Sequence, residues 1–248
     1  MRRALLVSAL GCLVTAATLH AQPHPGVALR WNHCFGEGTG ILVRSFACDT
    51  NAGLEELVGS FALYEDMPEV SGLEILVDVS TGNPYYPPAG PLPEWWKFVR
   101  AGTCRQNALS FSTVANPGDQ VCVDWASGQA VGALGDYVID FRGEGTARIR
   151  AVAAVPSASL GALYPGTEYY AFALRIRHDK TVGTGACAGC DVPLWIVFNS
   201  INVVTPLLAN NRTLTGPLNG VDSDIAIWAQ AKVPTRTESW SAIKARFR

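Results

Sequence analysis

Alternation of apolar and polar residues is the dominant pattern along this chain. Between residues 72 and 79 every odd position, from Leu73 to Val79, is apolar, while the even positions include Glu74 and Asp78. A period of two residues is typical of a strand with one buried face. We therefore expect a strand here whose odd positions face the core.

Similar β-type segments recur along the chain, with turn signals between them. Further strands are expected at Val27–Trp31, Gly40–Phe46, Leu54–Phe61, Leu109–Val114, Gln120–Trp125, Tyr137–Phe141, Thr146–Val155, Glu168–Arg177, Leu194–Val204 and Ile225–Ala229. About ten strands with almost no helical periodicity predict an all-β fold, a single β-sandwich of the jelly-roll or Ig-like type. Three tryptophans at these strands are expected in the core: Trp125, Trp195 and Trp228.

A proline-rich segment interrupts the strands between residues 81 and 93. Proline lacks the backbone N–H that a central strand or helix needs, so an extended surface loop is predicted. A short helix is expected next, over Glu94–Val99, with Pro93 in its first turn.

The first residues have the pattern of a secretory signal peptide. Arg2 and Arg3 precede an apolar run of about 14 residues, shorter than the roughly 20 needed to span a bilayer, and small residues follow. We expect a cleaved signal peptide over residues 1–21, one β-sandwich domain over 22–232, and no transmembrane segment after cleavage.

The C-terminal residues 233–248 form a basic amphipathic tail. Trp240, Ile243 and Phe247 would share one face of a short helix. The tail is interpreted either as a docked terminal helix or as a sorting signal.

Cysteine content agrees with export. Cys12 lies in the signal peptide, and six cysteines remain: Cys34, Cys48, Cys104, Cys122, Cys187 and Cys190. An even number in an exported chain indicates three disulfides. Among the fifteen pairings, proximity in sequence favours Cys34–Cys48, Cys104–Cys122 and Cys187–Cys190. Zinc would need four converging ligands, and a redox Cys-x-x-Cys would begin a helix; neither pattern is present.

Charge limits the class of partner. The net charge is −2, and loss of Arg2 and Arg3 with the signal peptide makes it −4. A mildly acidic protein lacks the basic face that nucleic acid requires. The expected partners are therefore a glycan or a surface protein, with self-association as an alternative, in an extracellular, cell-surface or periplasmic location.

Signals for catalysis are sparse. The chain has no GxSxG, HExxH or P-loop motif, and His178 falls in what resembles a solvated turn. Candidate acids for glycoside hydrolysis are Glu65, Asp66, Asp124, Asp136 and Asp140. No cofactor is expected, apart from a calcium candidate at Asp222 and Asp224, a pattern that ordinary turns also have.

Aromatic residues near the proline-rich loop are the candidate ligand-binding residues. They are Tyr85, Tyr86, Trp95 and Trp96. Sugar rings stack on flat exposed aromatics, and loops on a rigid sandwich are natural binding sites. The competing interpretation is that Trp95 packs inward.

Two segments resemble parts of uncharacterised secreted bacterial β-sandwich proteins with a Cys-x-x-Cys loop. They are Trp-Trp-Lys-Phe…Gly-Thr-Cys-Arg at Trp95–Arg105 and Gly-Thr-Gly-x-Cys-x-Gly-Cys at Gly183–Cys190. The resemblance implies a fold and no activity. At the level of fold the alternation is also similar to cohesin-like and carbohydrate-binding sandwiches, which is an analogy only.

Three functional hypotheses follow. A non-catalytic binding module, secreted or surface-attached, predicts that Tyr85, Tyr86 and Trp96 are exposed on one face. A structural or adhesive envelope protein predicts an exposed apolar patch or an unpaired strand edge. A carboxylate-based glycoside hydrolase predicts two acids facing each other in a cleft, one with a raised pKa.

Overall fold

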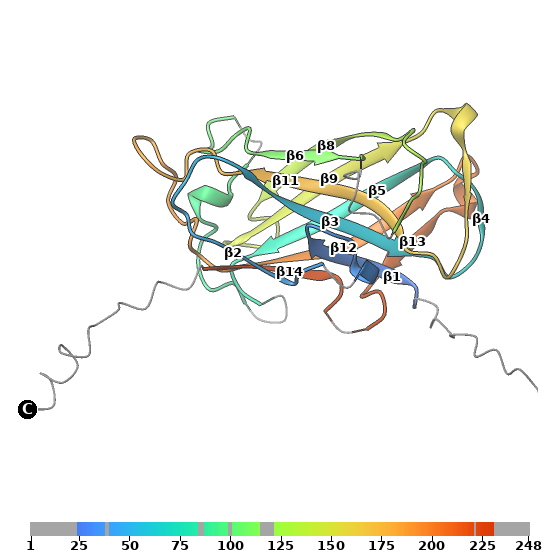
Figure 1. The fold of residues 1–248 in the computed structure, drawn as a ribbon, viewed down its shortest axis with the longest axis horizontal. Helices are drawn as coiled ribbons and strands as arrows, with labels where there is room; N and C mark the ends of the chain where they lie inside the picture. The colour runs from blue at the N-terminus through green and yellow to red at the C-terminus, as the bar shows by residue number, and fades with distance from the viewer. Residues whose placement is uncertain are drawn as a thin grey trace, which may run out of the picture.

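The computed structural model describes residues 24–37, 40–83, 87–98, 101–114, 122–220 and 222–230, and in this part the chain is almost entirely β (Figure 1). This confirms the predicted all-β class. The helical elements of the described chain are short 3-10 turns: η1 (Phe35–Glu37), η2 (Glu94–Trp96), η3 (Ser157–Ser159) and η4 (Leu208–Asn210). The helix expected at residues 94–99 is thus only the single turn η2.

The strands of the described residues form two large sheets and one small one. The first, five-stranded sheet contains β1 (Gly26–Trp31), β3 (Leu54–Ala62), β11 (Tyr169–Arg177) and β6 (Leu109–Ser112) in that order, with β7 (Val123–Asp124) also beside β11. The second, seven-stranded sheet contains β2 (Val43–Phe46), β14 (Ile225–Gln230), β12 (Leu194–Val204), β5 (Gly72–Ser80), β9 (Thr146–Ala154) and β8 (Val131–Ile139), with β13 (Arg212–Thr215) also beside β12. A two-stranded sheet pairs β4 (Met67–Val70) with β10 (Gly161–Leu163).

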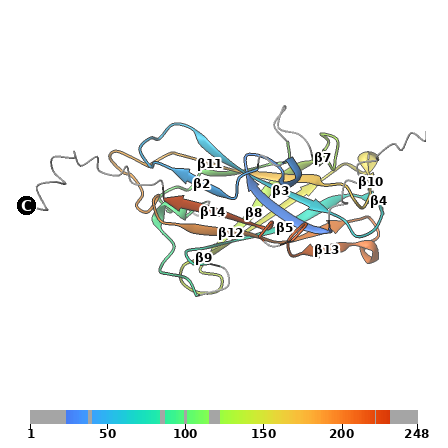
Figure 2. The ribbon, with the colours of Figure 1, turned by 60° about the horizontal axis from the view of Figure 1, so that its bottom comes forward.

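The two large sheets lie face to face and share one apolar core (Figure 2). Phe172 of β11 and Phe198 of β12 meet between them, with ring centroids 5.1 Å apart. On β5, the odd residues from Leu73 to Val79 are each at most 2% exposed, which confirms the predicted core face. The architecture is consistent with the predicted β-sandwich.

All six cysteines form disulfides, as predicted, but the predicted pairing is wrong. The bonds are Cys34–Cys122, Cys48–Cys190 and Cys104–Cys187, at sequence separations of 88, 142 and 83. Cys187 and Cys190 have different distant partners, because sheet pairing brings segments together that are far apart in sequence. Three disulfides indicate an oxidising environment.

The predicted signal peptide (1–21) and C-terminal tail (233–248) lie outside the described residues. None of the helical segments that are described has the length and hydrophobicity of a membrane-crossing helix.

Candidate functional site

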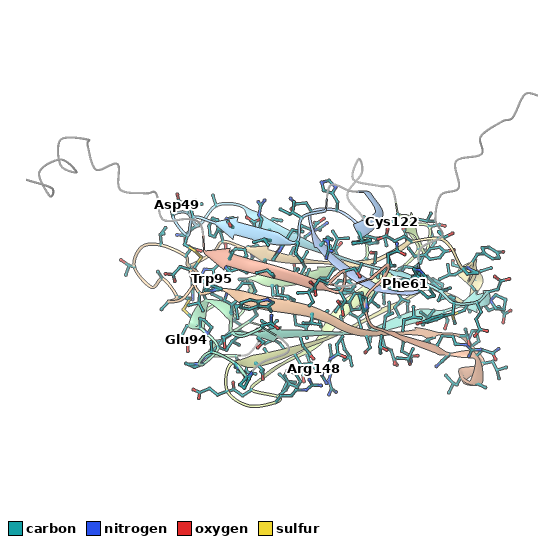
Figure 3. All side chains as sticks on the ribbon, turned by 90° about the horizontal axis from the view of Figure 1, so that it is seen from below. Asp49, Phe61, Glu94, Trp95, Cys122 and Arg148 are labelled. Carbon is teal, nitrogen blue, oxygen red and sulfur yellow. A yellow bond between two sulfur atoms is a disulfide. The ribbon has the colours of Figure 1, made fainter. Side chains whose placement is uncertain are left out.

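The structure does not support the predicted aromatic platform at Trp95 and Trp96. Tyr85 and Tyr86 lie outside the described residues. Trp95 and Trp96 are only 0% and 1% exposed, so they do not form an exposed platform, and the competing interpretation that Trp95 packs inward is confirmed. Figure 3 shows Trp95 within the body of the molecule, at the end where Glu94 and Asp49 lie.

Trp95 and Trp96 are buried because they belong to an aromatic cluster at this end of the sandwich. The Trp228 ring on β14 lies 5.3 Å from Trp95, 5.4 Å from Trp96 and 5.8 Å from Trp31 of β1. The Trp95 indole N–H donates to Thr181 Oγ1 at 3.0 Å. Packing of large rings therefore explains why η2 faces inward.

The two segments of the sequence resemblance pack against each other. The Trp95 amide donates to the Ala188 carbonyl at 2.9 Å, and Cys104–Cys187 joins the segments covalently. Gly189 has a positive φ of 90°, and a Cβ at this position would lie 2.4 Å from Pro93. These segments thus have a clear structural role in the described chain.

His178 is buried and does not lie in a solvated turn, which corrects the sequence interpretation. It is 5% exposed, and its ring stacks on Phe46 at 3.8 Å. Its Nδ1 lies 2.7 Å from the Ala52 carbonyl, and its Nε2 lies 3.1 Å from Glu55 Oε1. Glu55 also contacts Arg44, so His178 belongs to a buried polar network.

The five candidate acids come from separate parts of the fold. Glu65 and Asp66 precede β4, Asp124 lies on β7, and Asp136 and Asp140 lie on β8 and in the turn after it. Glu65 pairs with Arg212. Asp124 accepts from the amides of Ala126 (2.9 Å) and Gly128 (2.7 Å), which is turn chemistry.

At the calcium candidate the structure places an arginine. Arg30 Nη1 donates to the carbonyls of Asp222 (3.1 Å), Ser223 (3.0 Å) and Ile225 (3.0 Å). Backbone carbonyls of this kind would be needed to complete the ligand shell of a calcium ion. The guanidinium thus already supplies positive charge to this turn. Among the described residues, no group of three or more His, Cys, Asp or Glu side chains is arranged for a metal ion.

Asp224 at this turn should make stability depend on pH. Burial, with a contribution from Asp222, raises its pKa above the usual 3.8. The folded state therefore binds the proton more tightly than the unfolded state. The protonated side chain stabilises the fold below the unfolded-state pKa, and this contribution is lost as the pH rises through the raised pKa of the folded state. Asp224→Asn should therefore raise the melting temperature at pH 7 and leave it unchanged near pH 3. An equal shift at both pH values, in thermal unfolding followed by circular dichroism, would contradict this account.

Trp195, which we expected in the core, is instead partly exposed on the outer face of the second sheet. It faces away from its buried neighbours Leu194 and Ile196 on β12. It lines an apolar pocket of about 580 Å³ together with the end of the proline-rich loop. The other lining residues are Thr81, Ala89, Gly90, Pro91, Pro93, Val192 and Pro193.

Strand register places a polar network beside this pocket. Ser80 of β5 is the cross-strand partner of Trp195, and Asp78, two residues earlier on the same face, pairs with Val197. Asp78 accepts two hydrogen bonds from Arg148 of β9, at 2.6 and 2.8 Å, and one from Asn199 at 2.6 Å.

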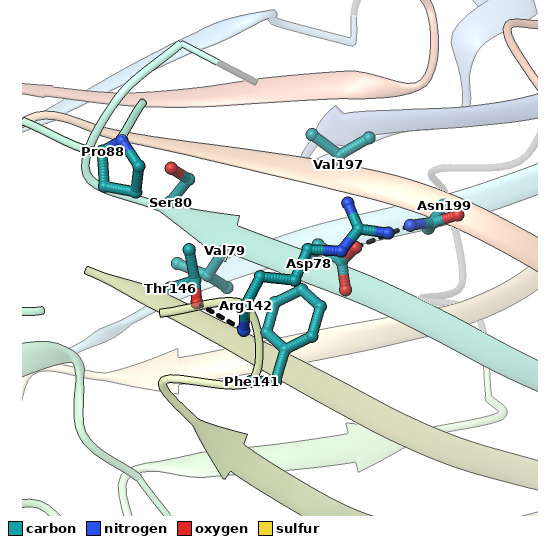
Figure 4. Close-up of a pocket in the computed structure, with 9 residues that line it drawn as sticks. All are labelled: Asp78, Val79, Ser80, Pro88, Phe141, Arg142, Thr146, Val197 and Asn199. Atoms are coloured by element: carbon teal, nitrogen blue, oxygen red, sulfur yellow. Dashed lines mark hydrogen bonds between the residues drawn. The ribbon is translucent and has the colours of Figure 1, made fainter. Parts of the chain in front are cut away.

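A second pocket is lined by Asp78 and Asn199 of this network, together with Phe141 and Arg142 (Figure 4). The Arg148 guanidinium lies 4.3 Å from the Phe141 ring, which holds it from the other side. Ser80 and Pro88 line this pocket, whereas Thr81 and Ala89 line the Trp195 pocket. The two pockets are therefore adjacent along the outer face.

The edge of the second sheet is also exposed. β8 pairs with β9 along one side, and no described strand pairs with its other side. Its nine residues contain one charged residue, Asp136, next to a shift in register after Leu134, and Val131 at its start is 72% exposed. Unpaired edges of this kind can associate with another strand. This is the feature that the structural hypothesis predicted.

Sequence reasoning misplaced Trp195 because residues 194–198 are apolar at every position, so the sequence does not show which face of the strand is buried. In the structure, buried and partly exposed positions alternate strictly from Leu194 to Phe198, and Trp195 has the outward phase.

Neither the protein-family models nor the curated protein sequences gave a match to this chain. The function is therefore inferred from the geometry of the site.

Proposed function

We propose that this protein is a secreted or surface-attached, non-catalytic module that binds a glycan on the outer face of its second sheet. The observation that carries the proposal is the partly exposed ring of Trp195, at a wide apolar pocket beside the Asp78 network. The location would be extracellular, at the cell surface or periplasmic, in agreement with the three disulfides.

The chemistry of the face suits a sugar. A pyranose ring has an apolar C–H face that stacks on an indole, and hydroxyls at its rim that need hydrogen-bond partners. Asp78 uses three acceptor positions for Arg148 and Asn199, and a carboxylate offers about four. Among the described residues, one acceptor position of Asp78 therefore remains for a hydroxyl.

The Asp78 network is also held in place before a ligand arrives. Arg148 binds Asp78 through two nitrogens and packs on Phe141, so neither side chain needs to be ordered on binding. Ordering fewer side chains lowers the entropic cost of association. Trp195 and Asp78 also lie on strands, and this likewise lowers the entropic cost of binding a ligand.

Retention on a panel of insoluble and soluble polysaccharides tests the proposal. Trp195→Ala should weaken binding to a retained polysaccharide by about 30-fold, the effect of removing a contact worth about 2 kcal/mol. The matched control is Tyr164→Ala, which removes an aromatic side chain that is 55% exposed elsewhere on the surface. Equal binding by wild type and Trp195→Ala would refute the assignment of the site.

The other hypotheses are distinguished in the same assay. Release of soluble sugar would favour the glycoside hydrolase. Failure to bind any polysaccharide, together with concentration-dependent self-association, would favour the structural or adhesive protein, with β8 as the strand that associates.

A further inference from the structure

A third pocket lies at the end of the first sheet and shares no lining residue with the two pockets of the glycan face. It is an open pocket between residues 103–108 and the end of β11 with the turn after it, and its volume is about 280 Å³. Its lining is Thr103, Cys104, Arg105, Gln106, Asn107, Ala108, Arg177, Asp179 and Lys180. Polar and charged groups therefore dominate it, in contrast to the Trp195 pocket.

The charges in this pocket do not balance. Three cations line it, Arg105, Arg177 and Lys180, against the single carboxylate of Asp179. That carboxylate lies 2.8 Å from Arg177 Nε, and the Lys180 ammonium donates to the Cys104 carbonyl at 2.8 Å. The lining thus has an excess of two positive charges.

Because Arg105 is buried, the excess of positive charge is energetically unfavourable. Arg105 is 2% exposed, its guanidinium carbon lies 3.4 Å from the centre of the Trp95 ring, and it donates to the carbonyls of Trp95 (2.7 Å), Asp179 (3.0 Å) and Arg177. In the described chain these hydrogen bonds go to neutral acceptors. Burial lowers the pKa of Arg105 to about 9, and the nearby Asp179 offsets only part of that effect. A buried charge without a bonded counter-charge is unfavourable.

We propose that this pocket binds a small oxyanion, and that a doubly charged phosphate or sulfate group fits it best. Such a group would balance the two excess charges, and guanidinium groups donate to oxyanions in pairs. Arg177 and Lys180 are exposed at the pocket, so they can reach an incoming anion, while Arg105 lies behind them. This site is independent of the proposed glycan face.

Calorimetry and thermal unfolding of the full disulfide-bonded chain test the inference. Sodium phosphate, sulfate and acetate are each compared with sodium chloride at matched ionic strength. Phosphate or sulfate should give a saturable binding isotherm and a melting temperature that rises with concentration, acetate a weaker effect, and chloride none. Whether phosphate or sulfate binds more tightly identifies the preferred group.

Variants separate binding from the general stabilisation that phosphate and sulfate give to many proteins. The double variant Arg177→Gln/Lys180→Gln should lose at least tenfold in affinity, because it removes the two exposed cations that can reach the anion. Its melting temperature in sodium chloride measures any change in the stability of the fold itself. The control is Arg150→Gln, which removes an exposed arginine of β9 and should bind as wild type does. Equal stabilisation of wild type and double variant, or the absence of an isotherm with phosphate and sulfate, would overturn the inference.

Discussion

Trp228→Ala should lower the free energy of unfolding by about 3–5 kcal/mol, the usual cost of truncating a buried aromatic side chain to alanine. Trp228 is 0% exposed and lies in the middle of the aromatic cluster, with the rings of Trp31, Trp95 and Trp96 around it. Its indole N–H also donates to the Cys190 carbonyl at 2.7 Å, and that carbonyl would lose its partner. The loss is large because a domain is stable by only about 5–15 kcal/mol.

The chain offers a matched control for this prediction. Trp195 lies on the neighbouring strand β12 but faces outward, so Trp195→Ala should cost less than about 1 kcal/mol. Guanidinium chloride unfolding of both variants measures the difference. Similar losses for the two would contradict the assignment of opposite faces.

Removal of the Cys48–Cys190 bond should have a comparable effect. The two cysteines are 142 residues apart, but Cys104–Cys187 provides a shorter covalent path between them. The effective loop is therefore much shorter than the full separation. In the chain-entropy model the double variant Cys48→Ser/Cys190→Ser should lose about 4 kcal/mol, because the unfolded chain gains freedom.

The same unfolding experiment measures this loss, under conditions that keep the other two disulfides oxidised. Peptide mapping of the variant confirms that Cys104–Cys187 and Cys34–Cys122 are intact. A free energy of unfolding within about 0.5 kcal/mol of the wild-type value would show that the bond adds little to the fold.

The strands could be predicted well where one face is buried. On β5 the alternation between Leu73 and Val79 gave the core face correctly, because burial of apolar side chains on one side of a sheet leaves a period of two in the sequence. The number of disulfides was predictable for a similar reason, since an exported chain rarely leaves cysteines unpaired.

Disulfide connectivity and the position of Trp96 could not be predicted in this way. Both depend on contacts between segments that are distant in sequence, such as Cys48 with Cys190 and Trp96 with Trp228. A local pattern contains no information on these contacts. The same limit applies to the oxyanion pocket, where Arg105 and Lys180 come together only in the folded chain.

Trp195 could not be placed from the sequence for a different reason, because the run from Leu194 to Phe198 is apolar on both faces of the strand. Its aromatic character suggested the core, but its phase on β12 is opposite to that of Leu194 and Ile196. For a strand at the surface of a sandwich, phase decides which face a residue occupies, and hydrophobicity alone does not. A large aromatic residue in the outward phase is therefore a useful indication of a binding face.

The most direct test of the glycan face is oxidation of tryptophan by N-bromosuccinimide, with and without a saturating amount of a retained polysaccharide. Mass spectrometry of peptides reports each tryptophan separately, and the buried residues Trp31, Trp95 and Trp228 serve as internal references. We predict that Trp195 is oxidised before these three in the free protein and is protected when the polysaccharide is bound. Equal oxidation of Trp195 in the free and the bound protein would contradict the proposal that the glycan lies on this face.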